Sequence, residues 1–225
     1  IFNNRLQKEE NEHAVAHYDG CIRYVDFHVG RLISHLEKNG LMKDTLIILT
    51  SDHGEGFGEH NIYFEHGEYL YDETLIVPLI IRHPKLPHKI IESQVQLTDI
   101  MPTVMEMLDI PLLDEPDGVS LVPLIKENKA VREYTFAETE RSYYNQNKGI
   151  YLGGIQGKWR MIRTNEWKLI YIPHPKEDIY ELYNIKKDPR ETTNLIKKNN
   201  EIAKSLKVEL FKWIKDKKEG KEEQV

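Results

Sequence analysis

The sequence predicts an α/β protein whose first part is a parallel sheet with helices and whose second part is a small antiparallel sheet packed on a C-terminal helix. Three observations support this fold class. A long helical pattern precedes a short β-branched run at 45–50, that run leads into an Asp-His-Gly turn, and short aromatic runs separated by Gly and Asn begin near residue 131. We therefore expect two domains, residues 1–130 and residues 131–225.

The first part is expected to alternate helices and strands. Apolar residues recur at three and four residue steps over 10–38, the spacing of one helical face, and Asn39-Gly40 ends that pattern. The apolar run at 45–50 suits a strand buried on both faces of a parallel sheet. The later elements are expected to be a short helix at 69–74, strands at 75–82 and 90–97, a helix from Thr98 or Asp99 to Leu108, and a proline-rich connection.

The second part reads as an antiparallel meander closed by a helix. Its strands are expected at 134–139, 149–155, 158–164 and 167–172, with turns at Gly157 and at Asn165-Glu166. In the final helix, 199–217, one face carries Ile202, Leu206, Leu210 and Ile214. This face should cover the sheet, and packing between helix and sheet accounts for the three tryptophans.

The segment after the first strand holds the chemistry. Asp52 and His53 leave the strand where ligands of α/β proteins bind, and a glycine-rich stretch with more acids and imidazoles follows, namely Glu55, Glu59, His60 and His66. A divalent cation or an anion fits this pattern. The plainer alternative is an Asp-His-Gly turn that ends a strand, with solvated histidines on the loop. Carboxylates favour Ca²⁺ or Mg²⁺, and a histidine ligand admits Mn²⁺ or Zn²⁺.

Composition narrows the range of partners. The 225 residues carry a net charge of −6 and are 40% hydrophobic, which suits a folded protein with no general attraction to nucleic acid or anionic lipid. No apolar run is long enough to span a membrane. The chain opens on Ile1 rather than Met, which suggests a C-terminal portion of a longer protein and leaves both cytoplasmic and periplasmic locations open. The oligomeric state is not indicated.

Several motifs resemble, in order, the second half of the sulfatases, which belong to the alkaline phosphatase superfamily. They extend over almost the whole chain: Thr50–Glu55, Gly58–His60, His66–Gly67, Tyr71–Glu73, Val77–Arg82, Leu97–Thr103, Asp117–Leu121, Glu181–Asn184 and Asp188–Leu195. The resemblance implies that the α/β part is the C-terminal part of an alkaline-phosphatase-like doubly wound sheet. It also implies a metal-dependent hydrolase of a small-molecule sulfate ester, with a divalent cation, Ca²⁺ foremost.

The resemblance also assigns roles within the loop. It makes Asp52 and His53 metal-site residues, with the His53 imidazole either ligating the ion or contacting the sulfate. Many sulfatases have a lysine where this chain has His66. His66 is therefore the candidate catalytic and substrate-binding residue, able to hydrogen-bond the anion or to protonate the leaving group. Glu55 and Glu59 are expected to be structural or to orient the ligands.

The sulfatase nucleophile is not found in these residues. Similar sulfatases carry a Cys/Ser-x-Pro-x-Arg motif whose first residue becomes formylglycine, and no such motif occurs here. Cys21, the one cysteine, lacks the motif and is expected to be a buried small side chain of the first helix. Formylglycine is thus expected only in an N-terminal half outside this chain, and the 225 residues alone are expected to be inactive.

Other functions remain open within the same resemblance. A histidine at the position of His66 also occurs in relatives that handle phosphate esters, so a phosphoester or phosphonate hydrolase, or a phosphoethanolamine or glycerol-phosphate transferase, is the alternative. A non-catalytic fragment or degenerate homologue is the third possibility.

Overall fold

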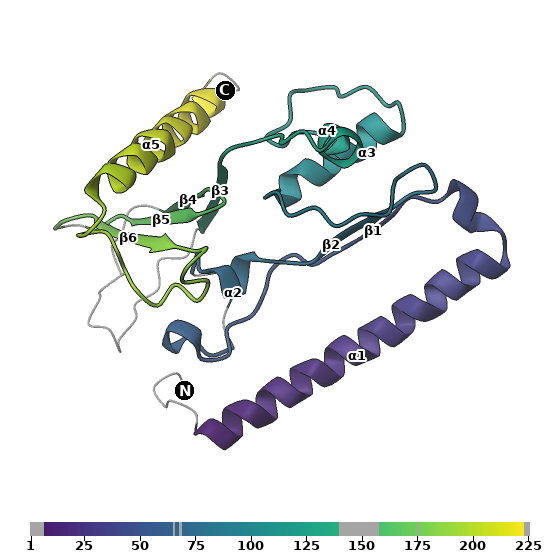
Figure 1. Cartoon of the computed structure of the whole chain (residues 1–225), viewed down its shortest axis with the longest axis horizontal. Helices are drawn as coiled ribbons and strands as arrows, with labels where there is room; N and C mark the ends of the chain where they lie inside the picture. Colours follow the sequence, from purple (N-terminus) through teal and green to yellow (C-terminus); the bar gives the residue numbers. More distant parts are fainter. Residues whose placement is uncertain (1–6, 65, 68, 140–157, 175, 223–225) are drawn as a thin grey trace. The chain divides into compact units, whose positions relative to one another are not determined.

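The computed structural model describes residues 7–64, 66–67, 69–139, 158–174 and 176–222. The chain divides into two compact units, whose helices and strands are labelled in Figure 1. The first unit comprises the residues up to His66 together with 76–88, and the second comprises 67–75 and the residues from 89 onward. The domain division at residue 130 stays a prediction, since a compact unit of contacts is not by itself a domain that folds alone.

The first unit begins with the long helix α1 (Lys8–Lys38). Its N-terminus is capped reciprocally, because the Gln7 side chain accepts from the backbone of Glu10 and the Glu10 carboxylate accepts from the backbone of Gln7. Asn39 ends the helix, and Gly40 follows with a φ of 65°, a left-handed conformation that glycine adopts without strain. The helix and its termination signal at Asn39-Gly40 were both predicted.

The apolar face of α1 is exposed rather than buried. No residue of α1 is buried, and Ile22, Val25 and Leu32 are 54%, 59% and 59% exposed. Cys21 is exposed as well, so the prediction that it is a buried core residue is wrong. The periodicity identified the helix correctly. Within the first unit, however, the described residues form no layer of structure over its apolar face.

Two short strands complete the first unit. Strand β1 (Ile47–Thr50) pairs with β2 (Leu79–Arg82) in the antiparallel direction, Ile47 opposite Arg82. The expected parallel pairing of this strand, with both faces buried, is therefore not found, and Ile80 of β2 is 58% exposed. A two-stranded ribbon has no further strands to bury its second face, which is why β-branched residues remain accessible here.

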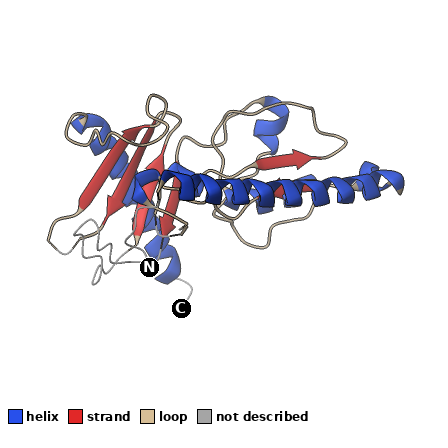
Figure 2. Cartoon of the chain, turned by 90° about the horizontal axis from the view of Figure 1, so that it is seen from below, coloured by secondary structure: helices blue, strands red, loops and turns tan. Residues whose placement is uncertain are grey.

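The second unit is built on a four-stranded antiparallel sheet, shown as adjacent red arrows in Figure 2. Its order follows the sequence: β3 (Thr135–Thr139), β4 (Trp159–Arg163), β5 (Trp167–Ile172) and β6 (Ile179–Asn184). The turn between β4 and β5 lies at Asn165-Glu166, as predicted, and is closed by the Thr164 N–H, which donates to the Trp167 carbonyl at 2.8 Å. Three of its four strands, β3, β4 and β5, were thus predicted from short β-branched and aromatic runs.

Helix α5 (Asn200–Glu222) covers one face of this sheet (Figure 1). Inward-facing residues of three strands and of the helix form the core: Ile162, Leu169, Leu182, Ala203, Leu206, Leu210 and Ile214. At the edge, Trp213 stacks on Phe136 with ring centroids 4.8 Å apart. The helical face expected to cover the sheet does so, because its apolar residues repeat at the helical period.

The opposite face of the sheet carries charge. Side chains alternate along a strand, so Lys168 faces away from the α5 core to which Leu169 belongs. Lys168 is 0% exposed, and its Nζ lies 2.8 Å from Asp72 Oδ1 and 2.8 Å from Glu191 Oε1. Arg163, on the neighbouring strand, places Nη2 3.3 Å from Asp72 Oδ2. The buried ammonium is therefore matched by two carboxylates from distant parts of the chain.

Further contacts hold residues 67–75, including the short helix α2 (Asp72–Leu75), on this charged face. The Tyr71 hydroxyl donates to Glu181 Oε2 at 2.9 Å, and burial raises the pKa of Tyr71 well above its usual range. The Asp72 N–H donates to Glu191 Oε2 at 2.6 Å, and the Thr139 hydroxyl donates to the Gly67 carbonyl. Segment 67–75 thus belongs to the second unit although both sequence neighbours lie in the first.

A second buried carboxylate organises the helical part of this unit. Asp99 ends the turn η3 (Leu97–Asp99) before α3 (Ile100–Met107), and its 0% exposed side chain accepts from the Val119 N–H at 3.0 Å and pairs with Arg132. A Cβ added at Gly118 would lie 1.9 Å from the Thr98 carbonyl oxygen, so the close approach requires glycine.

Three element assignments differ from the sequence prediction. Residues 90–97 are not a strand, and Ile90 is 92% exposed. Helix α4 (Val122–Glu127), with Pro123 in its first turn, lies in the connection expected to be irregular, and strand β6 was not recognised as a strand. The expected strand at 149–155 and the turn at Gly157 lie outside the described residues. None of the described helices has the length and apolar character needed to cross a bilayer.

We expect Lys168→Met to lower the free energy of unfolding by about 3–5 kcal/mol, because the change leaves the buried Glu191 carboxylate without its cation and leaves Asp72 with Arg163 alone. Urea denaturation followed by circular dichroism measures this loss. Lys186→Met is the matched control, since Lys186 is exposed and the same charge and shape change there should leave the urea midpoint unchanged. Equal midpoints for the two variants would contradict the role given to Lys168.

Candidate active site

The loop that follows β1 doubles back on itself. Phe57 and Tyr63 form an isolated antiparallel bridge, and the Phe64 N–H donates to the Gly56 carbonyl at 2.8 Å. Gly58 makes the turn possible, because it has a φ of 110° and a Cβ there would lie 2.8 Å from the Tyr63 ring. The loop thereby returns His66 to the carboxyl end of β1, next to His53.

Asp52 presents an ionised carboxylate to solvent. Its side chain is 84% exposed, and Oδ1 accepts the His53 N–H at 3.0 Å and the Ser51 hydroxyl at 3.3 Å. The hydrogen bond from the His53 backbone is the main cause that lowers the pKa of Asp52 below its usual value. The second oxygen, Oδ2, lies 3.6 Å from His53 Nε2.

The two histidines stack on each other. The rings of His53 and His66 are nearly parallel, at 10°, with centroids 3.9 Å apart. His53 Nδ1 lies 2.7 Å from the Gly54 carbonyl oxygen, which can only accept, so Nδ1 carries the proton. Nε2 of His53 then offers its lone pair on the side of the Asp52 carboxylate. This is the tautomer that a metal ligand requires.

Glu55 orients His66. Its Oε2 lies 3.1 Å from His66 Nδ1, and the carboxyl side chain is only 19% exposed. Because a carboxylate accepts, His66 donates through Nδ1, and Nε2 is the ring atom left for a ligand. The Glu55 carboxylate therefore fixes the orientation of the His66 ring. The second oxygen of Glu55 is buried and has no hydrogen-bond partner among the described residues.

The donor set fits a divalent cation in part. Asp52 Oδ2 and His53 Nε2, 3.6 Å apart, are close enough for both to contact one ion, given metal–ligand distances of about 2.0–2.6 Å. Two ligands are fewer than the six to eight that Ca²⁺ takes or the four of Zn²⁺. The carboxylate and the imidazole are therefore compatible with Ca²⁺, Mg²⁺, Mn²⁺ or Zn²⁺ and do not discriminate among them.

All three residues selected from the sequence, Asp52, His53 and His66, come together in the first unit. Glu59 has a structural role, because its Oε2 accepts the Phe57 N–H at 2.7 Å within the loop. The pairing of Glu55 with His66 was not specified from the sequence. The two residues are 11 positions apart in an irregular loop, where no periodic pattern marks a contact.

Comparison with known families agrees with this fold. Residues 2–110 match the family model described as Sulfatase, and residues 58–217 match the model described as N-sulphoglucosamine sulphohydrolase, C-terminal. The second match covers most of the chain. The chain belongs to the sulfatase family, a hydrolase family of the alkaline phosphatase superfamily.

Individual relatives support the same assignment. The chain is 30% identical to an arylsulfatase of Clostridium perfringens over 224 residues, which is 97% of this chain and 43% of that protein. It is similar to a solved structure in complex with the substrate D-glucosamine-2-N,6-O-disulfate, at 29% identity and a TM-score of 0.66, covering 88% of this chain and 39% of that one. It is also similar to a phosphonate monoester hydrolase of Agrobacterium radiobacter, at 28% identity and a TM-score of 0.78, covering 92% and 42%. The predicted fold class is confirmed.

The chain spans well under half the length of the curated relatives it matches. The shares of the arylsulfatases K from cattle and human are 37% and 38%. The residues described above therefore correspond to one part of a larger enzyme in those relatives.

We expect the 225-residue chain to bind Ca²⁺ only weakly, with a Kd of about 10⁻⁴ M or higher, because Asp52 and His53 supply too few ligands for a tight site. Calcium titration by isothermal calorimetry measures this. Asp52→Asn should abolish the residual binding, whereas Asp44→Asn, which removes another exposed carboxylate of the same unit, should not. Tight stoichiometric binding by the chain alone would contradict the prediction.

Proposed function

We propose that this chain is the metal-binding and leaving-group part of a sulfuric ester hydrolase. The observation that carries the proposal is the cluster of Asp52, His53 and His66 at the end of β1, in a chain that belongs to the sulfatase family. The likeness to an enzyme in complex with a sulfated glucosamine supports a small-molecule sulfate ester as substrate.

Asp52 and His53 would hold the divalent cation. The hydrogen bond from the His53 backbone lowers the pKa of Asp52 and so favours its charged form, and the His53 tautomer leaves Nε2 to ligate the ion. When bound, the cation supplies positive charge next to the sulfate oxygens, as Lewis-acid sites do for anionic esters. Ca²⁺ is our preferred ion because the resemblance to the sulfatases implies it and the carboxylate of Asp52 is compatible with it.

His66 would act on the leaving group. Its Nδ1 donates to Glu55, and its Nε2, when protonated, can give that proton to the ester oxygen as the bond to sulfur breaks. The stacked His53 ring fixes the plane of His66. In this role His66 hydrogen-bonds the substrate before the reaction and neutralises the departing alkoxide during it.

The nucleophile is not among these residues. The Cys/Ser-x-Pro-x-Arg motif does not occur in the sequence, and Cys21 lies on α1 without that motif. We propose that hydrolysis needs a formylglycine from outside this chain and that the 225 residues alone turn over no ester. Intact mass of the protein from its source, set against the 26.5 kDa of these residues, shows whether a longer protein exists.

A phosphonate or phosphate ester hydrolase is the second candidate. It is favoured by the likeness to a phosphonate monoester hydrolase and by His66 at the position where the sulfatase resemblance implies a lysine. Parallel assays of the native-length protein with 4-nitrophenyl sulfate and 4-nitrophenyl phenylphosphonate separate the two. Higher kcat/KM for the sulfate supports the first proposal, and higher kcat/KM for the phosphonate overturns it in favour of the second.

We expect His66→Gln in the native-length enzyme to lower kcat for an alkyl sulfate by about 10²–10⁴-fold, because a poor leaving group needs a proton. The loss should be much smaller for 4-nitrophenyl sulfate, whose leaving group is stable as an anion. Steady-state kinetics with both esters measures the contrast. His88→Gln, which changes an exposed histidine of the same unit, should alter neither value. A uniform loss with both esters would assign His66 to binding instead.

A further inference from the structure

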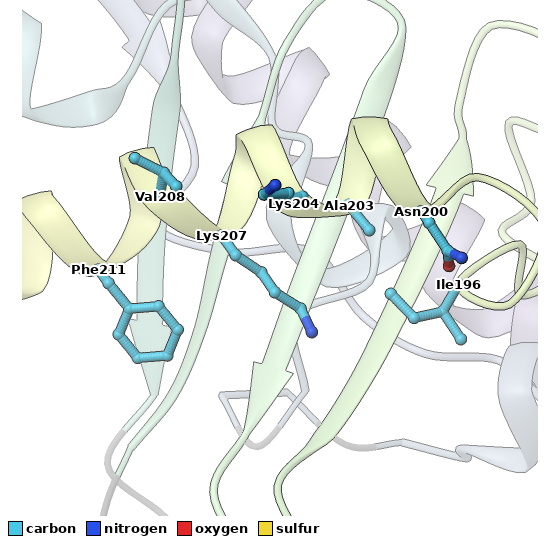
Figure 3. Close-up of a pocket in the computed structure, with 7 residues that line it drawn as sticks. All are labelled: Ile196, Asn200, Ala203, Lys204, Lys207, Val208 and Phe211. Atoms are coloured by element: carbon cyan, nitrogen blue, oxygen red, sulfur yellow. The ribbon is translucent and has the colours of Figure 1, made fainter.

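A shallow groove runs along α5 and the segment just before it, where Ile196 lies. Its volume is about 600 Å³, and Figure 3 shows the side chains that line it, which are mainly apolar with two lysines and an asparagine. The groove lies entirely in the second unit. Its size is within the range of sites that take one sugar-sized ligand.

The two lysines of the groove lie on one side of the helix. Lys204 and Lys207 are one turn apart, and Figure 3 shows both side chains beside the groove. Glu209 and Asp216 fall on a different side of α5, about a third of a turn or more from Lys204, whereas Glu201 precedes Lys204 by one turn. The chain carries a net charge of −6, so this positive edge differs from the average of the molecule.

Aromatic rings form the floor next to the lysines. Lys207 Nζ lies 3.3 Å from the centroid of the Tyr180 ring, a cation–π contact. The Tyr171 ring contacts both Tyr180 and Phe211, with centroids 5.4 and 5.2 Å apart. Phe211 is 41% exposed and Val208 is 60% exposed, so the apolar surface is open to a ligand.

Lys207 is held against this apolar surface rather than in open water. Burial lowers the pKa of its ammonium group, and nearby Asp178 acts in the opposite direction. Asp178 itself accepts a hydrogen bond from the Tyr171 hydroxyl at 3.3 Å. An anionic group that reaches Lys207 would stabilise the charged form of its ammonium group.

We propose that this groove is a secondary binding site for a sulfated sugar chain, with sugar rings on Phe211 and Val208 and sulfate groups on Lys204 and Lys207. The choice of a sulfated chain rests on the proposed function, and the groove residues are all distinct from those of the candidate active site. Apolar sugar faces stack on aromatic rings, and lysines pair with sulfate as mobile point charges. A site of this kind would hold a polymeric substrate near the enzyme and raise its effective concentration.

Calorimetric titration of the 225-residue chain with a heparin-derived hexasaccharide tests the proposal. We expect binding that the double variant Lys204→Gln/Lys207→Gln weakens by about tenfold, and that Phe211→Ala weakens several-fold. The matched control is Lys186→Gln/Lys212→Gln, which removes the same charge from exposed lysines outside the groove and should leave the Kd within twofold. Amide NMR shifts on titration should be largest for residues of α5.

Competing ligands identify the source of any binding. A chemically desulfated hexasaccharide should not bind, and a single-stranded 12-mer of DNA should bind at least tenfold more weakly than the sulfated hexasaccharide. Equal binding of DNA, an equal loss in the control pair, or no binding of the hexasaccharide would overturn the proposal. These experiments measure binding affinity, so a groove that does not bind the hexasaccharide leaves the hydrolase proposal intact. Conversely, a native-length protein without sulfatase turnover would leave a measured affinity of the groove intact.

Discussion

The buried ammonium of Lys168 is the constraint on which the second unit depends. It projects from the face of the sheet that α5 does not cover, where an unpaired charge would be strongly unfavourable. Asp72, which lies 96 residues before Lys168, and Glu191, which follows the last strand, both pair with this ammonium group. If either carboxylate moved away, the buried ammonium would lose part of its compensating charge. The sheet therefore dictates the position of Asp72 and of the short helix α2 within the second unit.

The candidate active site depends on a different principle. Asp52 and His53 are placed by the end of β1 alone, since two residues after a strand have little freedom. His66 is placed by a loop that folds back through the Phe57–Tyr63 bridge and by the carboxylate of Glu55. Local backbone geometry thus positions Asp52 and His53, which we propose to bind the metal, and a longer-range hydrogen bond orients His66, which we propose as the proton donor. This division matches the roles proposed for them.

The two units differ in how completely they bury their apolar surface. In the second unit Ile162, Leu169 and Leu210 are 0% exposed, and both faces of the sheet carry contacts. In the first unit α1 buries no residue, and the apolar side chain of Ile80 on β2 is largely exposed. Hydrophobic burial is the main favourable term in folding, so the second unit holds most of the described stabilising contacts. The exposed stripe of α1 is consistent with a chain that corresponds to less than half of its relatives.

The sequence by itself determined the elements whose pattern is local. The period of α1 and α5, the turn at Asn165-Glu166 and the pair Asp52-His53 follow from spacing, turn chemistry and position after a strand. It did not determine that 90–97 is irregular or that β1 pairs antiparallel with β2, because both depend on which partner is available across the sheet. Only the tertiary structure decided that Glu55 meets His66 and that Lys168 meets Asp72 and Glu191. Such contacts join residues far apart in the sequence, and the geometry that brings them together exists only after the chain has folded.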